Sequence, residues 1–554
     1  MGQRPGRTTT VLIAAICGVT LAGPQTASAD TLEPLAPATA TAFHESVGVS
    51  THPFYFGTPY GDWNQVLQRI RELGVDHLRG DVQTRADPAF NRRLNDALRA
   101  TVAAGIQLDV VLAQDCNGNG PVDPCLDVVR ALPAGSVDLL EWPPEMDIRG
   151  GPNWPSALPA RGREMYTKVK ADPALRGIPV VGPTLVDPDS FVRLGDQSAY
   201  LDLGNIQPYM GALSPNPLHI LAERRKVAPT SGAKPVIATG AGFHVAPEFD
   251  NTDQPAADEG SAAIYTVRTV LEHFADGLGR TYLYELVDEP FGVRSSKSYY
   301  GLLRGDFSPR PSFTALKNLL TMVGSGAPAT FPLRYAVTGD TRDLRQLLLQ
   351  QADGTYLLAL WRTASVWDRD TKTRLTVQPK SYILDAPDAL EVARGDPHLG
   401  PGFTPLSVGD GEIDLNIGAH PALLRIRTPR AAVLGGSDAA GSGDAARDRT
   451  APRIKSVKLR KLRNGRWAAR FRLDETATVR ARLDRGRPQS KRFRLLRRVK
   501  GRPFRSGPRT YTVGTLKRGR HRILLSAKDA AGNQRHVLVT FKVKAKKTKR
   551  KTSR

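Results

Sequence analysis

Cysteine is scarce in this chain of 554 residues, which contains three. So few cysteines exclude a small scaffold held together by many disulfides. Two of them, Cys116 and Cys125, lie on one short segment with no further Cys or His nearby, which argues against a metal site there. If the protein is exported, a disulfide between Cys116 and Cys125 is the simplest prediction.

Long apolar runs and nucleotide-binding loops are also missing. Beyond the N-terminal segment, no stretch reaches the roughly 18 apolar residues of a membrane-spanning helix. No Gly-rich phosphate loop of the G-x-G-x-x-G or Walker type lies between a predicted strand and a predicted helix. We therefore predict no transmembrane span, no cofactor and no metal ion.

The first 29 residues have the features of a signal peptide. Arg4 and Arg7 precede an apolar run from Val11 to Ala22, and Ala-Ser-Ala at 27–29 is a typical cleavage site. Cys17 lies in the apolar run and would be removed with it. We expect cleavage before Asp30 and a protein that is secreted or associated with the cell envelope.

Acidic residues are rare in the last part of the chain. Residues 451–554 contain 36 Lys and Arg but 4 Asp and Glu, whereas the whole chain has a net charge of +24, so the preceding residues are mildly acidic. This asymmetry is typical of a protein that binds a polyanion. The segment lacks the aromatic platform of single-strand binders, which favours an anionic cell-envelope polymer over nucleic acid. Alternatively, the arginines only occupy solvated positions.

Periodicity divides the remaining chain into domains. Residues 30–42, rich in Ala, Pro and Thr, are predicted to be disordered. Residues 43–328 alternate eight apolar strand segments with helical segments, which is the pattern of a (β/α)8 TIM barrel. The helical period disappears over 329–428, which predicts an all-β sandwich. The predicted order ends with a linker (429–450), a small basic immunoglobulin-like β domain (451–545) and a basic tail (546–554).

A carboxylate ends the strand that is predicted over 137–141. The chain there reads LLEWPPEMD from Leu139 to Asp147, and alternation of side chains places Glu141 and Glu145 on one face. Catalytic side chains of a (β/α)8 barrel project from the C-terminal ends of its strands. Glu145 is therefore the candidate catalytic residue, and the alternative is an ordinary carboxylate at the barrel rim.

Six barrel segments repeat a known pattern in order: Arg79 on strand two, Pro144-Glu145-Met146 on strand four, Gly182-Pro183-Thr184 on strand five, Pro208-Tyr209 on strand six, residues 235–244 on strand seven and residues 284–289 on strand eight. In this order they resemble the retaining glycoside hydrolases of the large (β/α)8 clan. Those enzymes carry an acid/base Glu after strand four and a nucleophile Glu after strand seven. The resemblance covers residues 43–428 and implies that Glu145 is the acid/base and that a glycan is the substrate or ligand.

The chain departs from this pattern at the reacting groups. Retaining hydrolysis needs two carboxyl groups about 5–5.5 Å apart, but Gly240 stands at the nucleophile position. Pro144 replaces the Asn before the acid, and Gln207 replaces the His of strand six. We therefore expect a pseudoenzyme that binds carbohydrate with lost or altered retaining catalysis.

Two alternatives stay open. In the first, the protein is an active glycosidase in which a relocated carboxylate works with Glu145, as the wider inverting geometry of about 6.5–9.5 Å would allow. In the second, the protein has a structural or adhesive role at the cell envelope.

Other residues at the predicted rim are candidates for ligand contact. The predicted substrate-binding residues are Arg79, Trp142, Tyr209, His244 and Glu285, and the aromatic candidates for sugar stacking further include Tyr55, Trp154 and Phe243. Aromatic rings at a barrel mouth suit the apolar faces of sugars. Alternatively, the aromatic residues belong to the core, and Arg79 pairs with Glu141, Glu145 or Asp81. His52 and His244 stand in contexts too different to predict a metal site.

Overall fold

The computed structural model describes residues 30–116, 121–249, 254–290, 295–326, 331–408, 411–429, 452–462, 466–474, 477–486, 493–504, 507–528 and 534–543. The predicted signal peptide, the predicted basic tail and all but the first residue of the predicted linker lie outside these ranges. The chain divides into two compact units, 1–437 and 438–554. Within the described ranges, no helix is both long enough and apolar enough to span a membrane.

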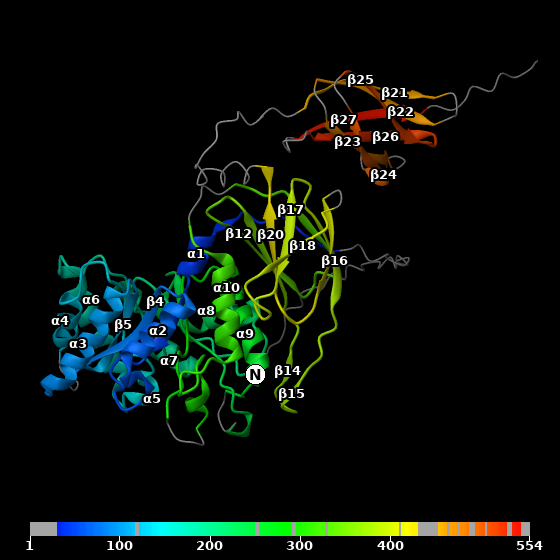
Figure 1. Ribbon diagram of the computed structural model, residues 1–554. Helices are drawn as coiled ribbons and strands as arrows, with labels where there is room; N and C mark the ends of the chain where they lie inside the picture. The colour runs from blue at the N-terminus through cyan, green and yellow to red at the C-terminus, as the bar shows by residue number, and fades with distance from the viewer. Residues whose placement is uncertain are drawn as a thin grey trace, which may run out of the picture. The chain divides into compact units, whose positions relative to one another are not determined.

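Eight parallel strands, coloured blue to green in Figure 1, form the central sheet of the first unit. Their spatial order is β7-β6-β5-β4-β3-β10-β9-β8. A backbone hydrogen bond of 2.9 Å from Gly182 to Leu203 joins β7 to the segment entering β8 and closes the sheet. The prediction of a (β/α)8 barrel is thus confirmed. The barrel strands are β3 (Val47–Thr51), β4 (His77–Thr84), β5 (Gln107–Cys116), β6 (Val137–Glu141), β7 (Val180–Val181), β8 (Gly204–Ile206), β9 (Val236–Ala241) and β10 (Thr281–Leu283).

Helices cover the barrel, and local side-chain chemistry sets their ends. α2 (Trp63–Leu73) begins where the Asp62 carboxylate accepts a hydrogen bond from the Gln65 N–H, and it ends at Gly74, whose φ is 81°. The remaining helices of this unit's barrel are α3 (Pro88–Ala103), α4 (Asp123–Arg130), α5 (Met146–Arg149), α6 (Trp154–Ala171), α7 (Pro188–Leu194), α8 (Pro217–Ser231), α9 (Glu259–Ala275) and α10 (Pro311–Val323), with 3-10 turns η1 (Pro59–Gly61), η2 (Ser198–Tyr200), η3 (Pro247–Phe249) and η4 (Ser296–Tyr299).

Two antiparallel-rich sheets follow the barrel and enclose a second core that includes Val337, Leu348, Leu358 and Leu384. One sheet has the order β1-β11-β16-β19, and the other has the order β18-β17-β20-β13-β12-β2. The strands are β11 (Ala336–Gly339), β12 (Leu344–Gln350), β13 (Tyr356–Arg362), β16 (Lys380–Asp385), β17 (Glu391–Gly395), β18 (Phe403–Leu406), β19 (Glu412–Ile417) and β20 (Ala422–Arg427), and β14 (Trp367–Asp368) pairs with β15 (Thr373–Arg374).

The prediction of disorder for residues 30–42 is wrong. β1 (Asp30–Leu32) pairs antiparallel with β11, and β2 (Ala38–Thr39) pairs parallel with β12. α1 (Ala40–Glu45) follows and buries Phe43 completely. Backbone groups at two sheet edges pair with this segment, and composition cannot reveal partners that lie about 300 residues away. The sandwich therefore consists of segments from both sides of the barrel.

A buried carboxylate on α9 joins the barrel to the sandwich. Glu272 is fully buried, accepts a hydrogen bond of 2.8 Å from the Trp361 indole and pairs at 2.8 Å with Arg345 of β12. Burial raises the pKa of Glu272 to about 7, although Arg345 acts in the opposite sense. The two cores therefore meet through specific polar contacts as well as packing.

The second unit contains two antiparallel sheets around one core, which includes Phe471, Leu483, Tyr511 and Ile523. One sheet has the order β21-β22-β25 and the other β24-β23-β26-β27. The strands are β21 (Ile454–Lys461), β22 (Trp467–Leu473), β23 (Ala477–Gly486), β24 (Phe493–Phe504), β25 (Gly507–Gly514), β26 (Gly519–Lys528) and β27 (Gln534–Val543). The all-β architecture fits the prediction for residues 451–545, and the immunoglobulin-like relationship stays a prediction.

Candidate functional site

Glu145 lies just beyond β6 at the C-terminal rim of the barrel, where all eight parallel strands end. Its backbone has φ 56° and ψ 33°. This left-handed conformation costs a non-glycine residue about 1–3 kcal/mol and persists only where surrounding interactions offset that cost. The Glu145 N–H donates to the Thr184 carbonyl at 2.8 Å. Its carboxylate, 24% exposed, pairs with Arg149 at 2.7 Å. The rim therefore fixes an accessible carboxylate that already has a cationic partner.

Arg79 points into the barrel and binds Glu141 through two hydrogen bonds. Arg79 Nε donates to Glu141 Oε1 at 2.6 Å, and Nη2 donates to Oε2 at 2.9 Å. Glu141 and the neighbouring Asp109 are both 0% exposed, and Arg79 is 6% exposed. Burial alone would lower the pKa of Arg79, but Glu141 reverses that effect and raises it. Arg79 is thus the counter-ion of the buried Glu141 carboxylate. This pairing was the alternative to the prediction that Arg79 contacts the ligand.

Asp109 lies next to this pair and makes no ion pair with another residue in the described part of the chain. Burial, followed by repulsion from Glu141, holds the pKa of Asp109 well above its usual range. A neutral Asp109 leaves one net negative charge on this pair of carboxyl groups, and Arg79 balances it. Arg79 is therefore the guanidinium that balances the pair of Glu141 and Asp109.

Gly240, on β9, faces the residues that follow strand six. A β-carbon at this position would lie 2.8 Å from Tyr209 Oη and 3.3 Å from the Gln207 side chain. Its φ lies outside the left-handed range, so the backbone would accept another residue. A side chain here would therefore project toward Tyr209, and the space beside the Gly240 Cα is taken by the tyrosine hydroxyl.

Tyr209 belongs to a group of aromatic rings at the same rim. Its ring lies 5.9 Å from Tyr300 and 6.2 Å from Tyr284, both edge to face. Burial raises the pKa of Tyr209 well above its ordinary value, and the charges on Glu145 and Glu285 add to this effect, whereas Arg79 opposes it. Tyr209 is only half-buried by exposure. It therefore lies within the electrostatic reach of Glu145 and keeps part of its surface open.

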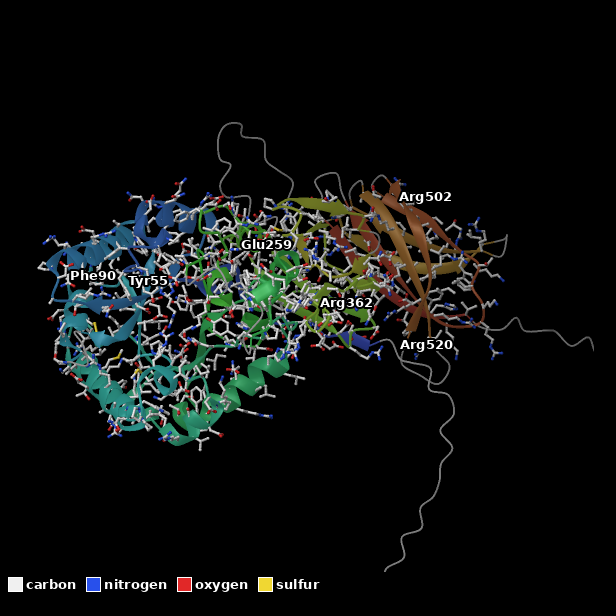
Figure 2. The ribbon with its side chains drawn as sticks, turned by 90° about the horizontal axis from the view of Figure 1, so that it is seen from below. Tyr55, Phe90, Glu259, Arg362, Arg502 and Arg520 are labelled. Carbon is white, nitrogen blue, oxygen red and sulfur yellow. A yellow bond between two sulfur atoms is a disulfide. The ribbon has the colours of Figure 1, made fainter. Side chains whose placement is uncertain are left out.

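A second polar group occupies the rim where strands one, two and eight adjoin. His52 follows β3, Asp81 lies in β4, and Glu285 and Glu289 follow β10. His52 Nε2 is 3.6 Å from Glu285 Oε2, and His52 Nδ1 is 3.8 Å from Asp81 Oδ2. Tyr60 donates to Glu285 Oε2 at 3.0 Å. Tyr55, labelled in Figure 2, stacks on the His52 ring at 4.6 Å.

The pKa values of the three carboxyl groups at this part of the rim shift in different directions. Burial raises the pKa of Glu289 to about 7, with His52 opposing and Asp81 adding to the rise. Burial and the charge on Glu289 raise the pKa of Glu285 well above its usual range. Burial alone would also raise the pKa of Asp81, but His52 and Arg79 hold it below its ordinary value. The rim therefore combines protonated and ionised carboxyl groups within one region.

Several predicted contact residues lie in the core instead. Trp142 is 0% exposed, and its ring fills the space beside Gly162 in α6, which assigns it to packing rather than to sugar stacking. Trp154 and Phe243 are 4% and 8% exposed. His244 is 1% exposed, and its Nε2 lies 2.6 Å from the Gln254 carbonyl oxygen. Of the aromatic candidates, Tyr55 and Tyr209 keep exposed surface at the rim.

From the sequence alone, His52 was set aside as a metal ligand, Glu289 was named only as the end of the strand-eight segment 284–289, and Arg149 was not considered. His52 directly follows a strand, and Glu289 follows Glu285 by four residues after another strand, so strand-end positions alone would have brought both to one rim. Arg149 lies four residues after Glu145, the spacing of an ion pair on a helix.

A disulfide holds the rim loop after β5. Cys116 ends β5 and Cys125 lies in α4, and their Cα atoms are 5.5 Å apart. Both cysteines are fully buried. The bond ties the end of strand three to the following helix.

No protein-family model matches the sequence, and no curated protein matches it. Among solved structures, the chain is similar to a family 39 glycoside hydrolase from the gut symbiont Bacteroides cellulosilyticus WH2, with 16% identity, a TM-score of 0.46 and coverage of 71% of this chain and 83% of that chain. It is also similar to a monomeric beta-xylosidase from Caulobacter crescentus CB15 (15% identity, TM-score 0.46, 72% of this chain and 98% of that chain).

A third similarity is to a glucosidase from Croceicoccus marinus, with 14% identity, a TM-score of 0.43 and coverage of 87% of this chain and 94% of that chain. With identities of 14% to 16% and TM-scores of 0.43 to 0.46, these similarities assign neither a substrate nor a catalytic residue to this chain.

Proposed function

We propose that the barrel binds a glycan at its C-terminal rim and does not catalyse retaining hydrolysis. The observation that carries the proposal is the environment of Gly240. A β-carbon at this position would lie 2.8 Å from Tyr209 Oη, so the tyrosine hydroxyl occupies the space where a side chain would begin. The sequence pattern expects the nucleophile here, next to the strand-six tyrosine. A glycine supplies no carboxylate, and loss of a nucleophile costs several orders of magnitude in rate.

The remaining rim chemistry supports binding. Tyr55 and Tyr209 offer partly exposed rings, and Glu145 with Arg149 offers charged hydrogen-bonding groups. Sugars combine apolar ring faces with hydroxyl groups, so that a site with both kinds of group is suited to them. The Glu145 carboxylate then acts as a contact for a hydroxyl rather than as half of a catalytic pair.

The test measures binding and hydrolysis with the same protein. We expect calorimetric titration with soluble xylo-, gluco- and galacto-oligosaccharides to detect binding of at least one series, and Tyr209→Leu to weaken that binding about tenfold. Tyr200→Leu, which removes a tyrosine packed against Arg163 on the outside of the barrel, is the matched control. Wild type should release no p-nitrophenol from aryl glycosides above background.

Hydrolysis by the wild type that Glu145→Gln abolishes would instead make the protein an active glycosidase with a relocated second carboxylate. Absence of both binding and hydrolysis across the panel would favour the structural or adhesive role.

We also propose that the second unit attaches this protein, exported as its N-terminal segment predicts, to an anionic polymer of the cell envelope. Its three-stranded sheet places like charges directly opposite each other: Lys458 faces Arg470, and Lys455 faces Arg472, all four exposed. Like charges at directly opposite positions destabilise an antiparallel pair. A bound polyanion removes that repulsion. Figure 2 also shows Arg502 and Arg520, which are exposed on the other sheet.

Salt should weaken this attachment strongly. We expect the full chain to bind immobilised poly(glycerol phosphate) with an affinity that falls steeply between low and physiological salt. Lys458→Gln/Arg470→Gln should lower the slope of log affinity against log salt by about two. Arg92→Gln/Arg99→Gln, which removes two exposed charges from α3 of the barrel, should leave the slope unchanged. Binding that is insensitive to salt would contradict the proposal.

A further inference from the structure

Three potential metal ligands converge where the first and last barrel strands adjoin. β10 pairs in parallel with β3, so the residues that follow these strands share one corner of the rim. His52, Glu285 and Glu289 each bring one ligand atom to this corner, and the three atoms lie within 4.8 Å of one another. The residues are 8%, 0% and 2% exposed. The pairing of β3 with β10 thus builds a buried cluster from two distant parts of the chain.

Most polar atoms of this cluster lack a hydrogen-bond partner among the described residues, and Glu285 Oε2, which accepts from Tyr60, is the exception. Both ring nitrogens of His52, both carboxylate oxygens of Glu289 and Oε1 of Glu285 make no hydrogen bond to any described residue. Buried polar groups are normally hydrogen-bonded, and leaving one unpaired costs about 1–3 kcal/mol. His52 Nδ1 is set aside because it lies 3.8 Å from Asp81 Oδ2, and the other four atoms in this corner point to a group that the polypeptide does not supply.

The spacing fits one small cation. His52 Nε2 and Glu285 Oε2 are 3.6 Å apart, which is long for a hydrogen bond. Zinc binds nitrogen and oxygen ligands at about 2.0–2.2 Å in a tetrahedral arrangement, which separates neighbouring ligand atoms by about 3.3–3.6 Å. The observed separation is therefore that of two ligands on one ion.

The other side of the His52 ring also matches a metal ligand. A histidine that binds a metal through one nitrogen usually directs its other nitrogen toward a carboxylate, which fixes the ring. His52 Nδ1 is 3.8 Å from Asp81 Oδ2, and the Tyr55 ring stacks on the imidazole. The imidazole is thus held between a carboxylate and an aromatic ring, with Nε2 toward the two glutamates.

We propose that His52, Glu285 and Glu289 bind a divalent cation of the zinc class, with Asp81 positioning His52. One imidazole and two carboxylates are a ligand set that zinc accepts, and three protein ligands leave a fourth position open. The cation balances the carboxylates of a corner where Arg and Lys make no ion pair with Glu285 or Glu289 within the described part of the chain. The ligands follow β3 and β10, whereas Gly240 lies on β9, and the proposal does not rest on the proposed glycan binding.

A second histidine cluster in the chain provides the matched control. In the sandwich, His398 Nδ1 and His420 Nδ1 lie 3.3 and 2.8 Å from the two oxygens of Asp396. The histidines there already satisfy the carboxylate, unlike the unpaired oxygens of Glu289. The variant His398→Ala/His420→Ala therefore removes two histidines without touching the proposed site.

The test uses the full chain, stripped with a chelator and titrated with Zn²⁺ in competition with a chromophoric chelator. We expect one high-affinity ion per chain and a rise in melting temperature on loading. His52→Ala and the nearly isosteric Glu289→Gln should each weaken binding by about 100-fold or more, and Asp81→Asn by about tenfold. The His398→Ala/His420→Ala control should retain wild-type affinity at this site.

Two results would overturn the proposal. One is a wild-type chain that takes up no Zn²⁺, because Glu285 and Glu289 then share a proton instead of a cation. The other is Zn²⁺ binding that His52→Ala and Glu289→Gln leave unchanged while the sandwich control abolishes it. Circular dichroism confirms that each variant is folded before titration, and Glu289→Gln keeps the test decisive if His52→Ala does not fold.

Discussion

Arg79→Met is expected to lower the free energy of unfolding of the first unit by about 3–5 kcal/mol, since it leaves a buried carboxylate without its counter-ion. Glu141 is 0% exposed and takes both of its short hydrogen bonds, 2.6 and 2.9 Å, from Arg79. Asn205 contributes only a long contact of 3.5 Å. Asp109 is equally buried and already favours its neutral form. Urea unfolding followed by far-ultraviolet circular dichroism measures the loss.

The same bidentate geometry occurs at the surface and provides the control. Arg334 binds Asp388 through Nε at 2.7 Å and Nη2 at 2.5 Å, but the Arg334 side chain is 74% exposed. Arg334→Met should therefore cost at most about 1 kcal/mol, as exposed ion pairs do. Arg79→Met/Glu141→Leu should recover part of the loss, because it removes the stranded charge. Equal costs for the buried and exposed arginines would refute the assignment of Arg79 as an interior counter-ion.

Gly240→Glu is expected to create retaining hydrolysis of aryl glycosides that the wild type lacks, with a gain of about two orders of magnitude or more. The new carboxylate would project beside Tyr209, whose hydroxyl can donate to it. The tyrosine must first give way, because a β-carbon at 240 would lie 2.8 Å from its Oη. Release of p-nitrophenol measures the rate, and proton NMR of the first-formed anomer measures retention.

Two companion variants separate chemistry from shape. Gly240→Ala displaces Tyr209 in the same way but adds no carboxylate, so it should stay inactive. Gly240→Glu/Glu145→Gln keeps the new nucleophile but removes the acid, and it should lose most of the gain. If Gly240→Ala gained as much activity as Gly240→Glu, position 240 would not be the site of a missing nucleophile.

The barrel could be predicted because its signals are local. The alternation of strand and helix periodicity depends only on residues that are close together in the sequence. The same holds for helix caps such as Asp62 and Gly74. The side of the sheet that Trp142 faces was also predictable: Glu141 points inward, so the next residue points outward beneath α6. Trp142 was predicted to stack on a sugar because it is aromatic, whereas the alternation of side chains along the strand predicts that its ring lies in the core.

The rim could be predicted only where one strand carries the pattern. Gly240 lies in a motif on β9, and Glu145 lies in a motif that begins on β6 and continues just beyond its end, so both lie at the rim as the sequence indicated. The cluster of His52 with Glu289 depends instead on the pairing of the first barrel strand, β3, with the last one, β10, which lie far apart in the sequence. The strands β1 and β2 likewise depend on long-range pairing, because their partners β11 and β12 follow the barrel in the sequence. Pairings of this kind are absent from any short window of sequence.

The attachment of residues 30–39 to the sandwich makes the barrel an insertion within another fold. Asp30 pairs with Gly339, and Ala38 pairs with Leu349, so these contacts bridge a very long loop. Contacts of such high sequence separation form slowly. Until they form, β11 and β12 keep open edges that can pair with strands of another chain. The order in which the barrel and the sandwich fold therefore governs the risk of intermolecular association. A barrel that folds late prolongs the time during which the edges of β11 and β12 are exposed.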